Sequence, residues 1–136
     1  MTGWWVPPRS TCALAFVLAL FAFSGCAKQA AAPKDRARVS GKVTLGGQPL
    51  PAGTVTFKSA NSPLSTPASI SEGGVYSTDR APLGKNIVSV DTSSIQYGNP
   101  AAYVPIPPKY SFPSTSGFTV DVQPGNNDDV NFALEK

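Results

Sequence analysis

The chain has 136 residues and a formal net charge of +3, with 14% charged and 41% hydrophobic residues. It contains no histidine, which removes the commonest general base, the commonest metal ligand and the usual partner of a catalytic serine or cysteine. The positive charge is weak and scattered, which argues against a nucleic-acid partner, because proteins of that class gather basic residues on one face.

Residues 1–25 are typical of a secretory signal. The leader Met1–Arg9 carries one positive charge and no acid, and the segment 13–23 (ALAFVLALFAF) is entirely apolar. This run is shorter than the roughly 20 residues that cross a bilayer, and it fits the hydrophobic region of a signal. Ser24, Gly25 and Cys26 follow, and they resemble the lipobox of bacterial lipoprotein precursors, with Phe23 where that family usually has Leu.

The lipobox resemblance implies that the thiol of Cys26 receives a diacylglycerol and that the signal is cut before it. Cys12 would leave with the signal, so the mature chain has no disulfide and a net charge of +2 after the loss of Arg9. Two or three acyl chains would then hold the protein to the membrane without a transmembrane helix. The other interpretation is a plain secretory signal that leaves Cys26 as a free thiol.

The resemblance also implies an address in the cell envelope. Ala27 follows the cysteine, whereas an Asp there would retain an enteric lipoprotein in the inner membrane, so the sequence favours the outer membrane. Residues 26–37 lack β-branched and aromatic side chains and are predicted to be a flexible tether. The tether region holds four basic residues, which would either attract anionic headgroups or form a solvated spacer, and the spacer is favoured because the cluster is short: Lys28, Lys34, Arg36 and Arg38.

From residue 38 onward, apolar and polar residues alternate with the period of two that β-strands show. Seven short strands are predicted, separated by glycine- and proline-rich turns: 39–45, 54–58, 69–71, 75–78, 87–90, 118–123 and 130–135. The last two are expected to form a hairpin around Pro124–Asn127. The prediction for residues 38–136 is an all-β fold, a seven-stranded antiparallel Greek-key sandwich with immunoglobulin-like architecture.

Three segments carry a resemblance to a known family. VSGKVTLGGQPLPAGTVTF (39–57), EGGVYSTDRAPLGKNIVSV (72–90) and IPPKYSFPSTSGFTVDVQPGNN (106–127) resemble the carboxypeptidase regulatory-like, transthyretin-related domains of planctomycete lipoproteins. The resemblance spans Val39 to Lys136. Two positions depart from the pattern, with Asn86-Ile87 where a Tyr is usual and Gly73 where an Asp is usual. The resemblance implies a transthyretin-like sandwich and assigns no activity.

Catalytic, cofactor and metal sites are not predicted. Cys26 is consumed by the lipid, so no thiolate nucleophile or metal ligand is left. Asp128 and Asp129, beside two asparagines, could suggest a calcium loop, but calcium takes six to eight oxygen ligands and solvated turn residues are favoured. Three further carboxylates stand isolated in the sequence: Asp79, Asp91 and Asp121. We therefore expect a protein that is not an enzyme and binds no cofactor.

The segment 92–116 holds five prolines among aromatic residues and has no predicted secondary structure. Long loops of this kind are uncommon in compact domains and are usually functional or disordered. The candidate partner-contact residues in this loop are Tyr97, Tyr103, Lys109, Tyr110 and Phe112. The alternative, which is favoured, is that the aromatic residues fold back as a lid over the sandwich, because a small domain needs its apolar residues in the core.

Three functional hypotheses follow, in order of preference. The first is a lipid-anchored envelope module with a structural or binding role, whose partners are the membrane, through Cys26, and an envelope protein or polysaccharide. The second is a lipoprotein that binds a carbohydrate or another small ligand in a concave pocket. The third, far behind, is a hydrolase that uses carboxylates or a Ser/Lys pair.

Overall fold

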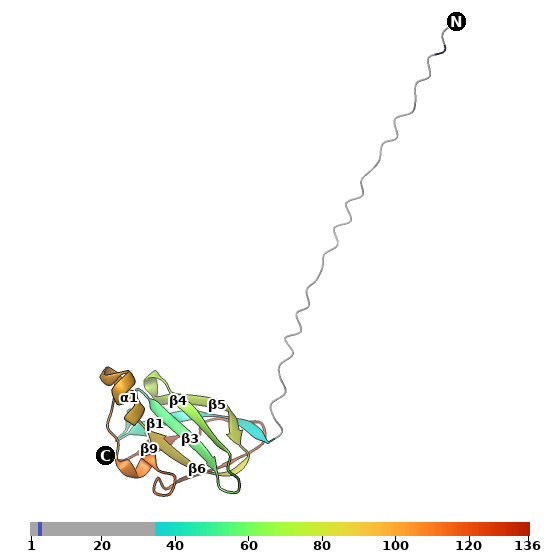
Figure 1. Ribbon diagram of the computed structural model, residues 1–136. Coiled ribbons are helices and arrows are strands. Elements are labelled where there is room, and N and C mark those ends of the chain that lie inside the picture. Colours follow the sequence, from blue (N-terminus) through green and yellow to red (C-terminus); the bar gives the residue numbers. More distant parts are fainter. Residues whose placement is uncertain (1–2, 4–34) are drawn as a thin grey trace.

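The computed structural model describes Gly3 and residues 35–136 (Figure 1). The predicted signal, Cys26 and most of the predicted tether lie outside the described residues. Within the described residues, no helix is both long and apolar enough to cross a membrane. The first strand begins at Arg36, two residues before the predicted start of the domain, and Ala37 is already buried in the core.

The described chain forms the predicted all-β sandwich, a single curled sheet folded into two layers (Figure 1). One layer is built around β1 (Arg36–Leu45), which pairs on one side with β5 (Val75–Pro82) and β2 (Gln48–Pro49), and in parallel with β8 (Asn126–Asn127) and β9 (Phe132–Leu134). The other layer has the order β4 (Ser65–Ile70), β3 (Gly53–Ser59), β6 (Gly84–Asp91), β7 (Phe118–Val122). A single residue pair, Ile70 with Tyr76, joins the layers along one side.

The antiparallel strands have Greek-key order. Strands β3, β4 and β5 follow one another as hairpins, and β6 returns to pair with β3. The alternation in sequence places one face of each strand in the core: Val39, Val43 and Leu45 of β1 are buried, as are Val55 and Phe57 of β3. The alternation of the predicted strands is thus confirmed, but some bounds differ: β4 covers 65–70 where 69–71 was predicted, and β9 covers only 132–134 of the predicted 130–135. In β6, Ile87 is only half-buried, where burial on both sides was expected.

Aromatic rings connect the middle of the core to its edge. Phe57, Tyr76 and Phe132 lie within 5.8 to 6.3 Å of one another between ring centroids, and Phe118 lies 5.3 Å from Phe132. Such offset and tilted pairs add roughly 0.5–1.5 kcal/mol each beyond the burial of area. The core is therefore held together across both layers by residues far apart in the chain.

Gly41 is required by a close approach of the backbone. Its absent Cβ would occupy the position of the Val130 carbonyl, which lies inside the sandwich directly under β1 and accepts a hydrogen bond from the Tyr76 hydroxyl at 2.6 Å. Gly41 therefore has a packing role, because any side chain at this position would displace the segment that contains Val130.

The predicted hairpin between the last two strands is wrong. After β7 the chain crosses to β1, where β8 and β9 run parallel to β1 instead of pairing with β7. The side-chain amide of Asn127 fixes this crossing: it accepts from the Gln123 N–H at 2.9 Å and donates to the Gln123 carbonyl at 2.8 Å and the Arg38 carbonyl at 3.2 Å. The Asn127 side chain thus bonds to backbone groups of Gln123 and Arg38 that a neighbouring strand would otherwise pair with. The residues after β7 therefore end that strand and do not form a hairpin.

The expectation of a structureless loop over residues 92–116 is also wrong. This segment contains the short helix α1 (Ser93–Gly98) and two 3-10 turns, η2 (Pro100–Ala102) and η3 (Pro108–Ser111). Pro100 and Pro108 each occupy the first position of a turn, where the missing N–H costs nothing. The prolines therefore order the segment by starting local turns.

Candidate functional site

The segment 92–116 covers one end of the sandwich, and hydrogen bonds within the segment hold its shape near its start and near its end. At its start, the buried Thr92 hydroxyl donates to the Val104 carbonyl at 2.9 Å. Val104 and Ile106 then pack, partly buried, against the core. Later in the segment, the Thr115 hydroxyl donates to the Lys109 carbonyl at 2.7 Å. The loop is thus a tightly held cover with apolar residues on its inner side.

Tyr110 is part of the core, so the interpretation of the loop as a lid holds for this residue. Its side chain is 4% exposed and its ring stacks on Phe118 with centroids 5.3 Å apart. Its hydroxyl oxygen accepts a hydrogen bond from the Glu135 N–H at 3.0 Å, and the Lys109 ammonium lies 4.7 Å from the centre of the ring. Tyr110 therefore offers almost no free surface to a partner, because its ring closes the seam between the loop and the C-terminal strand.

The other candidate contact residues remain at the surface to different degrees. Tyr97 on α1 is 85% exposed and Phe112 is 61% exposed, whereas Tyr103 is half-buried. Lys109 is exposed beside the Tyr110 ring. The five predicted residues do not converge on one point, and only Tyr97 and Phe112 offer large free apolar area.

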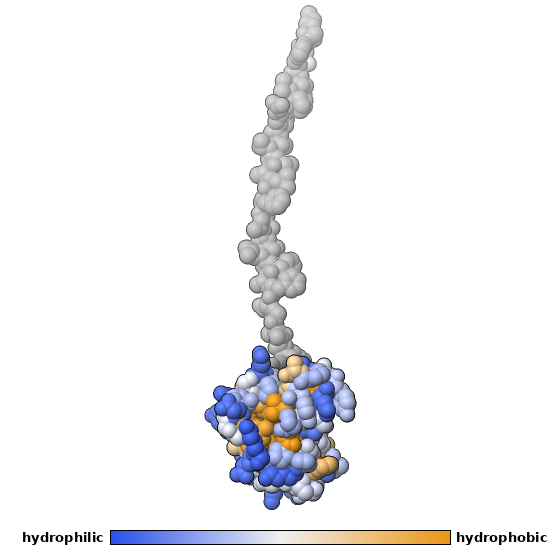
Figure 2. Space-filling view, turned by 90° about the vertical axis from the view of Figure 1, so that its left-hand side faces the viewer, coloured by the Kyte–Doolittle hydropathy of each residue, from blue (hydrophilic) through white to orange (hydrophobic). Residues whose placement is uncertain are grey.

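Beside this cover lies an apolar hollow of about 480 Å³. Its lining comes from β1, the proline-rich segment and the last residue of the chain: Leu45, Val104, Pro105, Pro107 and Lys136. Figure 2 looks onto this end of the molecule and shows apolar residues gathered near the middle of the face, with hydrophilic ones around them. The sequence pointed to Pro105 and Pro107 as members of the unusual loop, but no signal indicated that Leu45 and Lys136 would join them.

The hollow lies at the end of the domain opposite the point where the chain enters. Strand β1 runs from Arg36, beside that point, to Leu45, which lines the hollow. Ten residues of extended strand span about 30 Å. We call the end at Arg36 the tether end and the end at Leu45 and Lys136 the distal end.

A second, more polar hollow of about 340 Å³ lies along β1 between the two ends. Its lining contains a hydroxyl, an ammonium, two carboxylates and an amide: Ser40, Gly41, Lys42, Val75, Asp128, Asp129 and Asn131. The Ser40 hydroxyl donates to Asp128 at 2.6 Å, and the Asn131 side-chain oxygen accepts from the Lys42 N–H at 2.8 Å. Within residues 35–136, no three His, Cys, Asp or Glu side chains are placed to hold a metal ion.

Comparison with known proteins gives no further guide. Scans against protein-family models, curated proteins and solved structures each found no match to this chain. The two hollows and the chemistry of their linings are therefore the features of this chain that bear on its function.

Proposed function

We propose that this protein is a lipid-anchored, non-catalytic β-sandwich module of the cell envelope that binds a protein partner through its distal end. The observation that carries the proposal is the apolar hollow at the distal end, which acylation of Cys26 would hold away from the membrane. The signal, the lipobox and the resemblance to carboxypeptidase regulatory-like domains support the address in the envelope, with the outer membrane favoured.

The chemistry of the distal end suits insertion of apolar side chains from a partner. The hollow is within the range of about 300–1,000 Å³ that binding pockets show, and its walls are an aliphatic strand end and a proline-rich segment. Prolines and the internal hydrogen bonds of residues 92–116 leave little conformational entropy to lose on binding. Exposed aromatics such as Tyr97 and Phe112 are the residue types that dominate the energetics of protein interfaces.

The test places a charge in the hollow and compares it with the same change elsewhere. Pro105 lines the hollow and is exposed, and Pro63 is also an exposed proline, in the turn between β3 and β4 at the tether end. After cross-linking of intact cells and capture of the lipoprotein, we expect one dominant envelope protein with the wild type and with Pro63→Glu. With Pro105→Glu its recovery should fall at least tenfold, because the carboxylate would lose its hydration against the apolar side chains of the partner.

Equal recovery with both variants would overturn the assignment of the hollow, and recovery of nothing above background with the wild type would overturn the protein partner. The second hollow would then favour the alternative, a lipoprotein that binds a carbohydrate or another small ligand. Its converging hydroxyl, amide and carboxylate groups are the polar set that such a ligand requires.

The hydrolase hypothesis has less support from the same geometry. Lys42, Asp128 and Asp129 share the polar hollow, but all three side chains are exposed to solvent. Asp128 lies within hydrogen-bond reach of the Ser40 hydroxyl, at 2.6 Å, but within residues 35–136 no third side chain bonds to Asp128 and holds it in place, and Lys42 is exposed to solvent. Activation of a serine or lysine nucleophile needs such a positioned base or a desolvated lysine. Binding is therefore the function that the residues of this hollow support better than catalysis.

A further inference from the structure

The tether end and the rest of the described domain differ in net charge. Residues 35–136 contain eight basic and eight acidic residues, so their net charge is zero. The tether end has a net charge of +2, from five basic residues against three acidic ones: Arg36, Arg38, Lys58, Arg80 and Lys85 against Asp35, Asp79 and Asp121. The rest of the domain has a net charge of −2, from Lys42, Lys109 and Lys136 against Glu72, Asp91, Asp128, Asp129 and Glu135.

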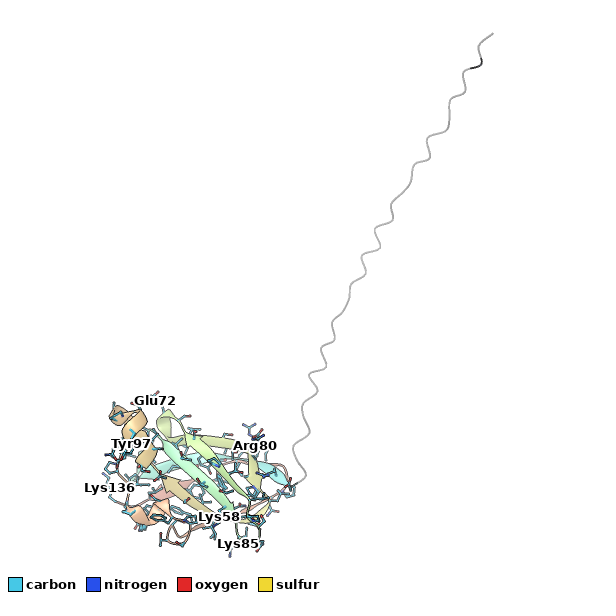
Figure 3. All side chains as sticks on the ribbon, in the orientation of Figure 1. Lys58, Glu72, Arg80, Lys85, Tyr97 and Lys136 are labelled. Atoms are coloured by element: carbon cyan, nitrogen blue, oxygen red, sulfur yellow. The ribbon has the colours of Figure 1, made fainter. Side chains whose placement is uncertain are left out.

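Strand pairing brings the basic residues of the tether end together from four strands. The Leu83 N–H donates to the Asp35 carbonyl at 3.2 Å, which places the turn between β5 and β6 beside the entry of the chain. The Lys85 carbonyl accepts from the Ala60 N–H at 2.9 Å, so the turn after Lys58 reaches the same end. Figure 3 shows Lys58, Arg80 and Lys85 toward the entry of the chain, with Glu72, Tyr97 and Lys136 toward the distal end.

These cations are directed into solvent. Arg38, Lys58, Arg80 and Lys85 are exposed, and the only ion pair within residues 35–136 joins Arg36 to Asp35 at 4.0 Å. The Arg36 guanidinium has a structural role as well, because it donates to the Arg80 carbonyl and the Thr66 hydroxyl, each at 2.9 Å. Lys58 and Lys85 thus form no ion pair within residues 35–136, although Lys85 lies across from Asp121 in the β6–β7 register, and they are the clearest members of the basic surface.

We propose that the tether end rests on a surface of anionic lipid headgroups and so holds the distal end away from the bilayer. Each basic residue near such a surface favours association by about fivefold. The tether adds Lys28 and Lys34, and its residues 27–34 reach at most about 29 Å, which keeps the face close to the membrane. Because the anchor supplies a high effective concentration, a weak attraction is enough to orient the domain. The inference rests on the proposed anchor in two respects: the anchor brings the tether end to the membrane, and it supplies the effective concentration that makes a weak attraction sufficient.

The experiment replaces the natural anchor, so it does not depend on acylation of Cys26 or on a protein partner. The chain from residue 27 onward contains no cysteine, and its whole hydrophobic core lies between residues 37 and 134. A histidine tag ahead of residue 27 attaches this chain to nickel-chelating lipid in vesicles. A single cysteine is placed at the exposed Asn61 in the turn after β3, or at the exposed Gln96 on α1 at the distal end.

The readout is the rate at which a bulky, water-soluble maleimide modifies each cysteine. On phosphatidylglycerol vesicles we expect modification at position 61 to be at least fivefold slower than on phosphatidylcholine vesicles, and modification at position 96 to be equal on both. The difference should vanish in about 1 M salt, where the Debye length falls to about 3 Å. Lys58→Glu with Lys85→Glu should abolish it, whereas Lys109→Glu with Lys136→Glu, the same change of charge, should leave it within twofold.

Three outcomes would overturn the proposal: equal rates at position 61 on both kinds of vesicle, protection that persists in high salt, or equal loss from the two double variants. Circular dichroism of each variant separates loss of binding from loss of fold. The maleimide readout involves neither acylation of Cys26 nor a partner bound in the hollow. A failure here therefore leaves the proposed partner binding untouched, and a failure of partner binding leaves this result standing.

Discussion

Tyr76 shows how one residue serves both layers of the core. Its side chain is 1% exposed, its ring lies between Phe57 and Phe132, and its hydroxyl donates to the Val130 carbonyl at 2.6 Å. Burial raises the pKa of this phenol well above its usual range, because the charged phenolate would lose its hydration. The sequence predicted a strand over 75–78, but nothing local indicated that the Tyr76 hydroxyl would meet a carbonyl 54 residues further along the chain.

Tyr76 is expected to make the domain less stable in alkali. Because its pKa is raised in the folded state, the folded chain holds this proton above about pH 10, where the unfolded chain releases it. The stabilisation by the buried, protonated phenol is fully present below about pH 10. Above that pH the free energy of unfolding falls by up to about 1.4 kcal/mol per pH unit. Urea unfolding between pH 8 and 11 should show a shallower slope in Tyr76→Phe than in the wild type.

Other tyrosines and lysines titrate in the same interval, so the comparison needs a control. Tyr97→Phe removes a phenol that is 85% exposed and should keep the slope of the wild type. A slope in Tyr76→Phe as steep as that of the wild type would contradict the assignment. At pH 7 the same variant should lose about 1 kcal/mol for the hydrogen bond to Val130.

Among the elements, strands were predicted well and the segment 92–116 was not. The strands follow a period of two, which short stretches of sequence carry by themselves. The exception is β4, of which only 69–71 was predicted although Ser65–Ile70 buries every second side chain. The loop has no such period, so aromatic residues in it can face either way. Which of them enter the core depends on whether a ring partner and a polar partner are in reach, as Phe118 and the Glu135 N–H are for Tyr110.

Because Tyr110 is buried and Phe112 is exposed, their replacement should change the free energy of unfolding by very different amounts. Tyr110→Ala should destabilise the domain by about 3–5 kcal/mol, because it removes a buried ring and leaves the Glu135 N–H without its partner. Phe112→Ala should change the free energy of unfolding by less than about 0.5 kcal/mol, because its side chain is 61% exposed. Urea denaturation measures both, and equal losses would show that Phe112 also belongs to the lid.

At the scale of the whole molecule, the two ends of the sandwich differ in chemistry. Basic residues gather at the tether end, while the apolar hollow and a net negative charge lie beyond it. This difference between the two ends can serve binding at a membrane only if the domain is held there in one orientation. The proposed anchor and the proposed contact with anionic headgroups would supply that orientation, and the distal end would then be presented to partners.

The anchor itself is tested by mass and by solubility. The membrane-extracted protein should begin at Cys26 and carry the added mass of two or three acyl chains. Cys26→Ala should lack that mass and leave the membrane fraction on washing, because the tether-end charges alone bind weakly. A wild-type chain that carries no acyl mass would refute the lipobox interpretation.

Local patterns in the sequence determined the all-β class, the positions of the seven principal strands and their inward faces, because side-chain alternation and turn residues act over a few residues. The tertiary structure alone decided that β9 pairs parallel to β1, that Tyr110 is core and Phe112 is surface, and that Leu45 and Lys136 meet the proline-rich segment around one hollow. These features join residues far apart in the chain: Val43 pairs with Phe132, the Tyr110 hydroxyl meets the Glu135 N–H, and Leu45 lines the same hollow as Lys136. Their formation depends on which long-range partner offsets the entropy of closing the chain, and short-range periodicity carries no information about that choice.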